Sequence, residues 1–376
     1  MASISSELIA AALSPDRPTA LAATRRLFVE FIEPLGDVFE PSEAARYIRM
    51  FSGILRQVYP ALQSFDIEGR YARISRPRIL AGEPKTIFVL SRVTLGADVA
   101  VTSVVIDAAK QRFPGSRICF VGPRKNAELF TDVELCEIPY PRSGTLMERL
   151  SIWPKLQDLF SIPDSLVLDP DSRLTQLGLL PAGRDDDYYF LDSRSYGGNS
   201  NESLVELTRR WIGMPTARAY IHTGLGANVF TTTVSLGVGE NADKRLPDPF
   251  ESELLKMLPQ PLLIDRGAGG EEAERVERAV ATAGVKAKFW EGSFAGFAEH
   301  IRRSRLYVGY DSAGGHVAAA CTVPLVSIAK GFICDRMFQR WRPSGNGSIK
   351  VIRVVKESFA EVLPLVSAAI GELTSD

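Results

Sequence analysis

The sequence has few cysteines and histidines and no excess of charge of either sign. Its 376 residues include 4 Cys and 3 His, and 44 Lys and Arg stand against 45 Asp and Glu, for a net charge of -1. The cysteines have no CxxC or other metal-ligand spacing, so they predict free thiols in a reducing compartment rather than a disulfide framework or a metal centre. The balanced charge argues against a general nucleic-acid surface or a polybasic membrane surface.

Long hydrophobic runs are also missing. The longest apolar run, residues 317–329, is shorter than the ~20 residues that a membrane-spanning helix needs, and it contains Pro324. The first 14 residues lack the basic start and the order of a signal peptide. We therefore expect a cytoplasmic protein with no transmembrane segment and no nucleic-acid partner.

The length of the chain predicts two domains and an additional segment. In the first part, apolar residues such as Leu27, Phe28, Phe31 and Ile32 recur at helical spacing, and β-branched runs are few. We predict that residues 1–75 form a helical N-terminal extension.

The rest of the chain alternates strands and helices. A strand at 86–90, a helix at 98–113 and a strand at 117–121 form a βαβ unit with a right-handed connection and parallel strands. Further strands are predicted at 165–168, 188–191, 229–236, 261–264, 286–289, 306–308, 323–328 and 350–355. The pattern predicts an α/β protein with two Rossmann-like, doubly wound domains (84–215 and 216–357) and a closing helix (358–376). Ligands of such folds bind in a cleft at the carboxyl ends of the strands.

One strand-to-helix turn stands out within the second predicted domain. Residues 307–320 read YVGYDSAGGHVAAA, a strand that ends at an acidic residue, a small-residue turn and an alanine-rich helix. The first turn of such a helix presents backbone N–H groups and the positive end of the helix dipole, which commonly bind a diphosphate. Close packing of the small residues is an equally good interpretation of the turn alone.

Three other segments, two of them glycine-rich and one acidic, do not indicate a cofactor. The glycines at 224–226 and 237–239 lack the third glycine of a dinucleotide fingerprint, which argues against a nicotinamide-dependent dehydrogenase. Residues 169–171 read Asp-Pro-Asp, and the proline favours a turn over a metal-binding acidic motif.

Five segments, in order along the chain, resemble glycosyltransferase family 9, the heptosyltransferase group with two Rossmann-like domains in the GT-B arrangement. They are residues 87–99 (IFVLSRVTLGADV), 112–118 (RFPGSRI), 244–247 (KRLP), the Gly-x-x-x-Glu turn that begins at Gly267, and 311–320 (DSAGGHVAAA). The resemblance covers roughly residues 85–356, so the N-terminal extension is additional to the family pattern.

The resemblance implies a metal-independent, cofactor-free inverting transfer of a sugar, typically heptose from ADP-heptose, to an acceptor hydroxyl or amine. It implies that Asp98 is the base that takes the proton of the acceptor. The alternative for Asp98 is a helix N-cap. It also implies that Lys244 is the cation at the leaving diphosphate, and Arg245 is equally well explained as a solvated neighbour.

The resemblance further implies a set of donor-binding residues: Gly239, Lys244, Gly267, Glu271, Glu272, Asp311, Ser312, Ala313, Gly314, Gly315 and His316. Glu271 or Glu272 is expected at the ribose hydroxyls, although acids are common in the first turn of any helix. Gly315 is expected to permit close approach of the diphosphate, while His316 contacts phosphate or packs. Arg173 and Arg194 are expected to contact the acceptor, with surface salt bridges as the alternative.

The expected partners are a nucleotide-sugar donor and an acceptor that is a saccharide, a small metabolite or a protein. Two other functions fit the same architecture. One is a non-catalytic protein that binds a nucleotide sugar or acts as a scaffold. The other is a sugar-nucleotide epimerase.

Overall fold

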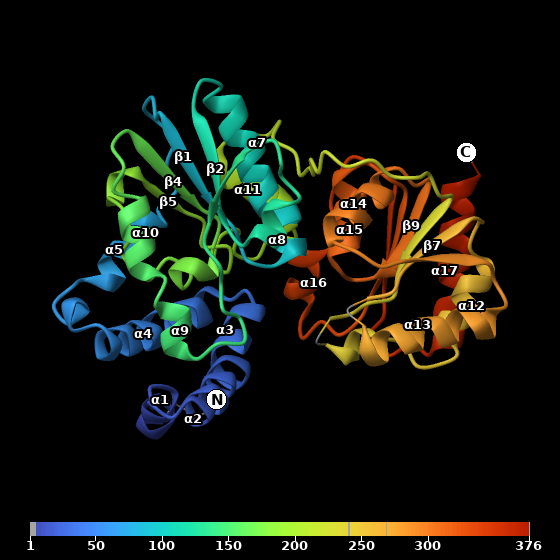
Figure 1. Ribbon diagram of the computed structural model, residues 1–376, viewed down its shortest axis with the longest axis horizontal. Helices are drawn as coiled ribbons and strands as arrows, with labels where there is room; N and C mark the ends of the chain where they lie inside the picture. Colours follow the sequence, from blue (N-terminus) through green and yellow to red (C-terminus); the bar gives the residue numbers. More distant parts are fainter. Residues whose placement is uncertain (1–4, 240, 268, 376) are drawn as a thin grey trace. The chain divides into compact units, whose positions relative to one another are not determined.

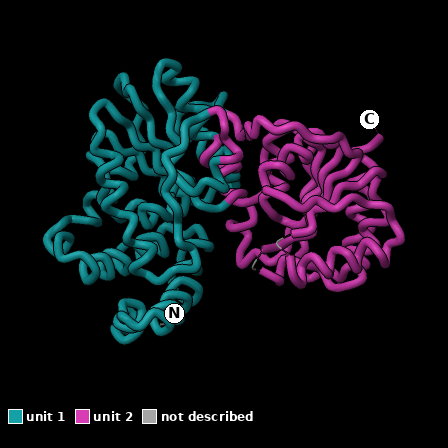
Figure 2. The backbone as a smooth tube through the Cα atoms, in the orientation of Figure 1, with its two compact units in different colours: residues 1–94, 104–127, 133–217 teal, residues 95–103, 128–132, 218–376 magenta. Residues whose placement is uncertain are grey.

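The computed structural model describes residues 5–239, 241–267 and 269–375, and the chain divides into two compact units. Unit 1 holds the residues up to 94 together with 104–127 and 133–217 (Figure 2). Unit 2 holds the residues from 218 onward and also the short segments 95–103 and 128–132. The segment that carries Asp98 therefore belongs to unit 2, although it follows the first strand of unit 1.

Unit 1 contains a sheet of five parallel strands in the order β3-β2-β1-β4-β5. The strands are β1 (Thr86–Leu90), β2 (Arg117–Gly122), β3 (Glu134–Glu137), β4 (Ser165–Asp169) and β5 (Tyr188–Phe190). Four of them confirm predicted strands. The edge strand β3 was not predicted because its sequence, Glu-Leu-Cys-Glu, lacks an apolar run, and its residues are exposed or half-buried.

The N-terminal extension consists of helices that pack into unit 1. They are α1 (Ser6–Ala12), α2 (Arg17–Arg26), η1 (Leu27–Ile32), α3 (Glu33–Asp37), α4 (Pro41–Val58), η2 (Pro60–Leu62) and α5 (Ile67–Ile74). The helical content of the extension is confirmed. Phe51 and Ile54 of α4 belong to the same hydrophobic core as Phe88 and Leu90 of β1, so the extension and the first sheet share one core.

Unit 1 contains further helices, several of which cover the sheet. They are α7 (Ser103–Arg112), α8 (Arg124–Ala127), α9 (Leu146–Leu150), α10 (Trp153–Leu159), η4 (Arg173–Thr175), η5 (Asp185–Asp187) and α11 (Leu204–Ile212). Figure 1 shows α7 and α11 on one side of the sheet and α10 on the other. Upstream of α7 the chain is already helical, in α6 (Leu95–Ala97) and in a π-helical turn, η3 (Asp98–Thr102).

Unit 2 contains a sheet of six parallel strands in the order β11-β10-β9-β6-β7-β8. Its strands are β6 (Thr232–Ser235), β7 (Leu262–Asp265), β8 (Ala287–Trp290), β9 (Leu306–Tyr310), β10 (Leu325–Ala329) and β11 (Ile349–Arg353), all of them predicted. Its helices are η6 (Ala242–Lys244), α12 (Phe250–Met257), α13 (Gly270–Ala283), α14 (Phe294–Arg302), α15 (Ala313–Ala320), α16 (Asp335–Trp341) and α17 (Phe359–Thr374).

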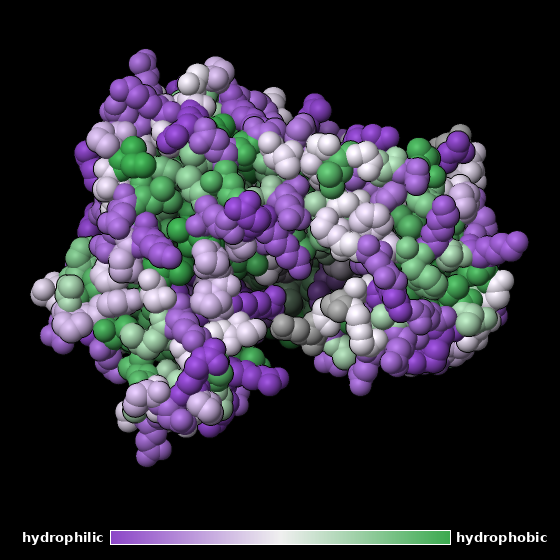
Figure 3. Space-filling model, viewed as in Figure 1, coloured by the Kyte–Doolittle hydropathy of each residue, from purple (hydrophilic) through white to green (hydrophobic). Residues whose placement is uncertain are grey.

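Helices cover both faces of the second sheet. Figure 1 shows α14 and α15 on one face and α12, α13 and α17 on the other. The outward side chains of α13 are charged, for example Glu274 and Arg278, which are both 69% exposed, and the surface over this helix is hydrophilic in Figure 3. Both sheets therefore confirm the predicted doubly wound α/β fold.

The strand order reverses between β1 and β4 in unit 1 and between β6 and β9 in unit 2. In open α/β sheets, ligands bind at the carboxyl ends of the strands at this switch point. The loops after β6 and β9 are therefore where unit 2 is expected to bind a ligand. Within the described ranges, no helix is both long enough and apolar enough to cross a membrane.

Candidate functional site

The loops after β6 and β9 bring two predicted donor residues together. Lys244 ends η6, downstream of β6, and Asp311 directly follows β9. The Lys244 ammonium donates to Asp311 Oδ2 at 2.6 Å and to the Asp311 carbonyl oxygen at 3.4 Å. The two side chains are 22% and 8% exposed. The switch point of unit 2 thus carries a half-buried cation that an acidic partner holds in place.

The predicted phosphate turn begins α15, as the sequence indicated. Ser312 is the N-cap residue, and within the described residues its cap position makes no side-chain hydrogen bond to the helix. The first amides of a helix generally have no intrahelical acceptor. The amide of Gly315 already donates to the Ser312 carbonyl oxygen at 3.2 Å, so the N–H donors that this end of α15 can offer, at the positive end of the helix dipole, precede Gly315. Asp311 and Lys244 lie directly beside these donors.

Gly314 and Gly315 differ in how much space their surroundings leave for a side chain. A Cβ atom on Gly314 would lie 2.2 Å from the buried hydroxyl of Tyr307, so packing alone requires glycine there. A Cβ on Gly315 would meet only Pro343 Cγ at 3.5 Å and Ser327 Oγ at 4.0 Å, which are ordinary contacts. The protein's own packing does not require glycine at 315, and the approach of a diphosphate to that position stays a prediction.

His316 lies inside the helix rather than at an open surface. Its ring stacks edge-to-face with Trp341 at 6.2 Å between centroids, and it touches Gly96, where an added Cβ would lie 3.2 Å from His316 Cδ2. Burial lowers the pKa of His316, and Lys244 lowers it further, against the opposing effect of Asp311. The imidazole is therefore neutral at pH 7, and these contacts favour the packing interpretation for His316.

Asp98 lies on a segment that packs against α15. Both α6 and η3 contact α15, and a Cβ on Gly96 would lie 3.2 Å from Ala313 Cα. The Asp98 side chain is buried, and its Oδ1 accepts a hydrogen bond from Thr102 Oγ1 at 2.7 Å. Because the preceding Ala97 is already helical, the N-cap interpretation of Asp98 is wrong.

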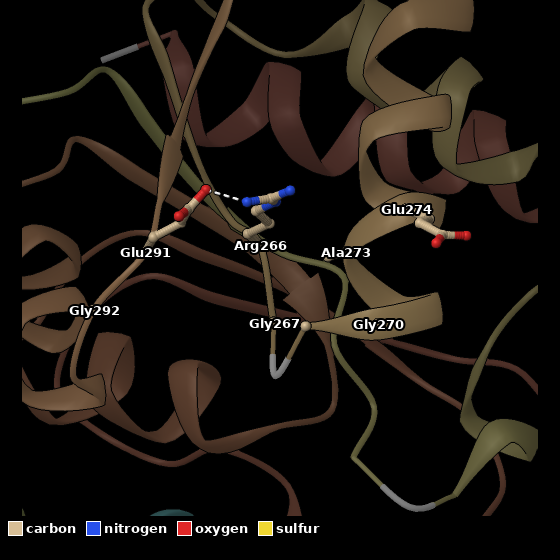
Figure 4. Close-up of a pocket in the computed structure, with 8 residues that line it drawn as sticks. Arg266, Gly267, Gly270, Ala273, Glu274, Glu291 and Gly292 are labelled. Atoms are coloured by element: carbon tan, nitrogen blue, oxygen red, sulfur yellow. Dashed lines mark hydrogen bonds and ion pairs between the residues drawn. The ribbon is translucent and has the colours of Figure 1, made fainter.

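A pocket of about 490 Å³ opens at the carboxyl end of β7 and the start of α13 (Figure 4). Its lining consists of Arg266, Gly267, Gly269, Gly270, Ala273, Glu274, Glu291 and Gly292. Arg266 and Glu291 point toward each other in Figure 4 and form an ion pair. The predicted Gly267, with φ of 79°, belongs to this pocket.

The two glutamates proposed for the ribose differ in position. The Glu272 carboxylate lies against two loops, since a Cβ on Gly237 would be 2.7 Å from Glu272 Oε1 and a Cβ on Gly267 would be 2.5 Å from Glu272 Oε2. Glu271 is exposed. Of the two, Glu272 therefore faces the loops after β6 and β7. Gly239 lies on the exposed part of the first loop.

Sequence reasoning missed a charged network next to Lys244. Arg245 Nε lies 3.1 Å from Glu251 Oε1, and Arg245 also pairs with Asp248 at 3.4 Å. The interpretation of Arg245 as a solvated neighbour is therefore wrong. Glu251 is buried and also binds Arg275. No local pattern indicates this network, because Arg275 is distant in sequence and faces Glu251 only through the packing of α12 on α13.

Arg173 and Arg194 lie in unit 1, at the loops after β4 and β5. Arg173 Nη1 pairs with Glu33 of α3 at 3.3 Å. The Arg194 side chain is 14% exposed, lies 4.0 Å from Asp171 and stacks over the Tyr47 ring of α4. Both arginines hold the extension to the sheet. Arg194 is largely buried and not a surface residue, and contact with an acceptor stays a prediction for both.

Comparison with known proteins places this fold. No protein-family model and no curated protein matches the sequence. The fold is similar to a glycosyl transferase family 9 structure from Veillonella parvula (14% identity, TM-score 0.56, 78% of this chain and 99% of that chain). It is also similar to E. coli heptosyltransferase WaaC with ADP (15%, 0.55, 77% and 100%) and to E. coli ADP-heptose LPS heptosyltransferase II (17%, 0.54, 76% and 99%). The chain therefore has the two-sheet α/β fold of family 9, as its motifs predicted.

Proposed function

We propose that this protein is an inverting, metal-independent glycosyltransferase. The sugar that it transfers is proposed to be heptose, which moves from ADP-heptose to an acceptor hydroxyl or amine. The observation that carries the proposal is the Lys244–Asp311 pair beside the N-terminus of α15 at the switch point of unit 2. A cation next to backbone N–H donors is suited to the charge that develops on a leaving diphosphate.

The donor is proposed to bind along the carboxyl ends of β6, β7 and β9. The diphosphate would contact Lys244 and the amides of residues 312–314, and it would approach closely at Gly315. The nucleoside would extend toward the pocket at Gly267, with Glu272 accepting hydrogen bonds from the ribose hydroxyls. Support comes from the position of Glu272 between the loops after β6 and β7 and from the pocket at the start of α13.

Asp98 is proposed as the base that takes the acceptor proton as the acceptor oxygen or nitrogen attacks the anomeric carbon. The C–O bond to the diphosphate then breaks, and the leaving group carries its charge toward Lys244. Support comes from the contact between α15, the helix that would hold the diphosphate, and the η3 segment that carries Asp98. The acceptor is proposed to be a saccharide, a small metabolite or a protein. The free thiols of all four cysteines agree with a reaction in the reducing cytoplasm.

Nucleotide binding is the first test. Thermal unfolding is measured with ADP, UDP, ADP-heptose and UDP-sugars, because a ligand at about 100 times its Kd adds ~2.7 kcal/mol of stability. We expect stabilisation by the adenine nucleotides and its loss in Lys244→Ala. No shift with any nucleotide would contradict the proposal.

Catalysis is the second test. Asp98→Asn is expected to bind ADP as the unchanged protein does and to lose transfer of heptose from ADP-heptose to candidate acceptors, measured as ADP release and glycosylated product. Nucleotide binding without product in the unchanged protein would favour a non-catalytic binding protein. Full turnover in Asp98→Asn would remove Asp98 as the base.

A further inference from the structure

Glu251 is a buried carboxylate that lies behind the proposed donor residues. It stands in the first turn of α12 and is 1% exposed. Arg245 Nε donates to its Oε1 at 3.1 Å, and Arg275 Nη1 donates to both of its oxygens. Charge-assisted bonds from two planar guanidinium groups fix the geometry of all three side chains more tightly than single neutral hydrogen bonds would.

The first branch of this network leads to Lys244. Arg245 is the next residue, so its ion pair with Glu251 anchors the backbone that carries Lys244. On the other side of Arg245, the amide of Leu246 donates to the Tyr310 hydroxyl at 3.3 Å. The segment is thus held at Arg245 and at Leu246, while the Lys244 ammonium extends to Asp311, the residue before the N-cap of α15.

The second branch leads to Glu272. Arg275 Nη2 donates to the carbonyl of Leu236, the residue after β6, at 2.9 Å. Arg275 also lies 4.0 Å from Glu272 Oε1, whose carboxylate rests against Gly237. Arg275 therefore orients both the start of the loop after β6 and the acidic side chain that faces this loop.

We propose that Glu251 is a positioning residue that sets the diphosphate contact and the ribose contact together, through Arg245 to Lys244 and through Arg275 to Glu272. The inference rests on the proposed nucleotide-sugar binding at this site. A buried ion network adds little net stability compared with apolar packing, so stability alone does not explain this one. Its two branches end at Lys244 and Glu272, and we infer that the network fixes the geometry of these two proposed donor-binding side chains. Glu251 acts only through its partners and does not itself touch the donor.

The test compares ADP affinities measured by calorimetry on the full chain. Arg245→Gln cuts the first branch and leaves the buried Arg275–Glu251 pair in place, so it is the variant with the smaller risk to folding. We expect Arg245→Gln and Glu251→Gln each to weaken ADP binding on the order of 10-fold. At metal sites, removal of a residue that orients a ligating side chain lowers affinity by about 10-fold or more. Glu253→Gln is the matched control, because Glu253 lies on the same helix and pairs with Lys256 at the surface.

A double-mutant cycle separates positioning from fold stability. If Arg245 acts through Lys244, then Arg245→Gln added to Lys244→Ala weakens ADP binding no further than Lys244→Ala alone. Independent, additive losses in the double variant would overturn the inference, and so would unchanged ADP affinity in Arg245→Gln. Failure of the unchanged protein to bind ADP would instead contradict the proposed function itself. Thermal unfolding of every variant shows whether a loss of affinity merely follows a loss of folded protein.

Discussion

At the scale of single residues, the neighbouring glycines in the first turn of α15 have different reasons to be glycine. Gly314 faces the hydroxyl of Tyr307, a fully buried side chain near the start of β9. Gly315 faces no such obstacle. The sequence motif presents both as one glycine pair, and only the packing of α15 on β9 separates a glycine that the fold needs from one that is free to serve a ligand.

The first prediction follows from this difference. Gly314→Ala is expected to destabilise the protein by about 1–3 kcal/mol, because the new methyl group overpacks the contact with Tyr307. Gly315→Ala is expected to be neutral or stabilising by up to ~1 kcal/mol, since alanine favours a helix over glycine, and to weaken ADP binding. Urea unfolding and calorimetry measure the two effects. Equal destabilisation by both substitutions would contradict the assignment.

A second prediction concerns Asp169 at the end of β4. Burial raises the pKa of this carboxyl to about 6, although Thr175, Tyr188 and the amide of Ser172 donate hydrogen bonds that lower it. Because the folded-state pKa lies above the unfolded value, the folded protein holds the proton more tightly. The stability contributed by this group is therefore present below about pH 4 and lost as the pH rises toward 6, by about 3 kcal/mol in total.

Asp169→Asn removes this titration. The difference in unfolding free energy between the variant and the unchanged protein should therefore change between pH 4 and 6, in the direction of a relative loss for the unchanged protein as the pH rises. Urea unfolding at several pH values measures it. A constant difference over this range would show that Asp169 titrates with an ordinary pKa.

At the scale of the elements, the sequence predicted what is encoded locally. The strand Thr86–Leu90 contains an uninterrupted apolar run at 87–90 and is buried throughout, and the predicted closing helix is observed as α17, which begins after Ser358. The edge strand β3 carries no such run, and the π-helical turn at Asp98 has no sequence signature. Both were missed for that reason.

The candidate site shows the same division between local and distant information. The turn at 311–316 was recognisable because strand, turn and helix follow one another in the chain. The contact between Lys244 and Asp311 depends on β6 and β9 being neighbours, which follows from the strand order and from no local pattern. The Glu251 network depends on the packing of α12 against α13. The sequence predicts both helices locally but does not show that they pack against each other.

At the scale of the whole molecule, this chain is longer than the structures it is similar to. Those structures are matched over 99–100% of their own lengths but over only 76–78% of this one. The helical spacing of its apolar residues predicted that the N-terminal extension is helical. This spacing alone does not show which surface a helix packs against. In the structure its apolar faces complete the core of unit 1.

The last prediction tests whether the extension and the first sheet unfold together. Phe51 is completely buried, contacts the rings of Phe28 and Tyr47 and lies in the core shared with β1. Phe51→Ala is expected to destabilise unit 1 by about 3–5 kcal/mol, whereas Val29→Ala, at a position that is 55% exposed, should change little.

Hydrogen exchange followed by mass spectrometry locates the effect of Phe51→Ala. If one core joins the extension to the sheet, the amides of β1 and β4 exchange faster together with those of α4, because unfolding of a shared core is cooperative. The amides of β9 in unit 2 serve as the internal reference and should be unchanged. Faster exchange confined to the extension would mean that the sheet of unit 1 is stable without it, and the extension would then be an appendage to the fold.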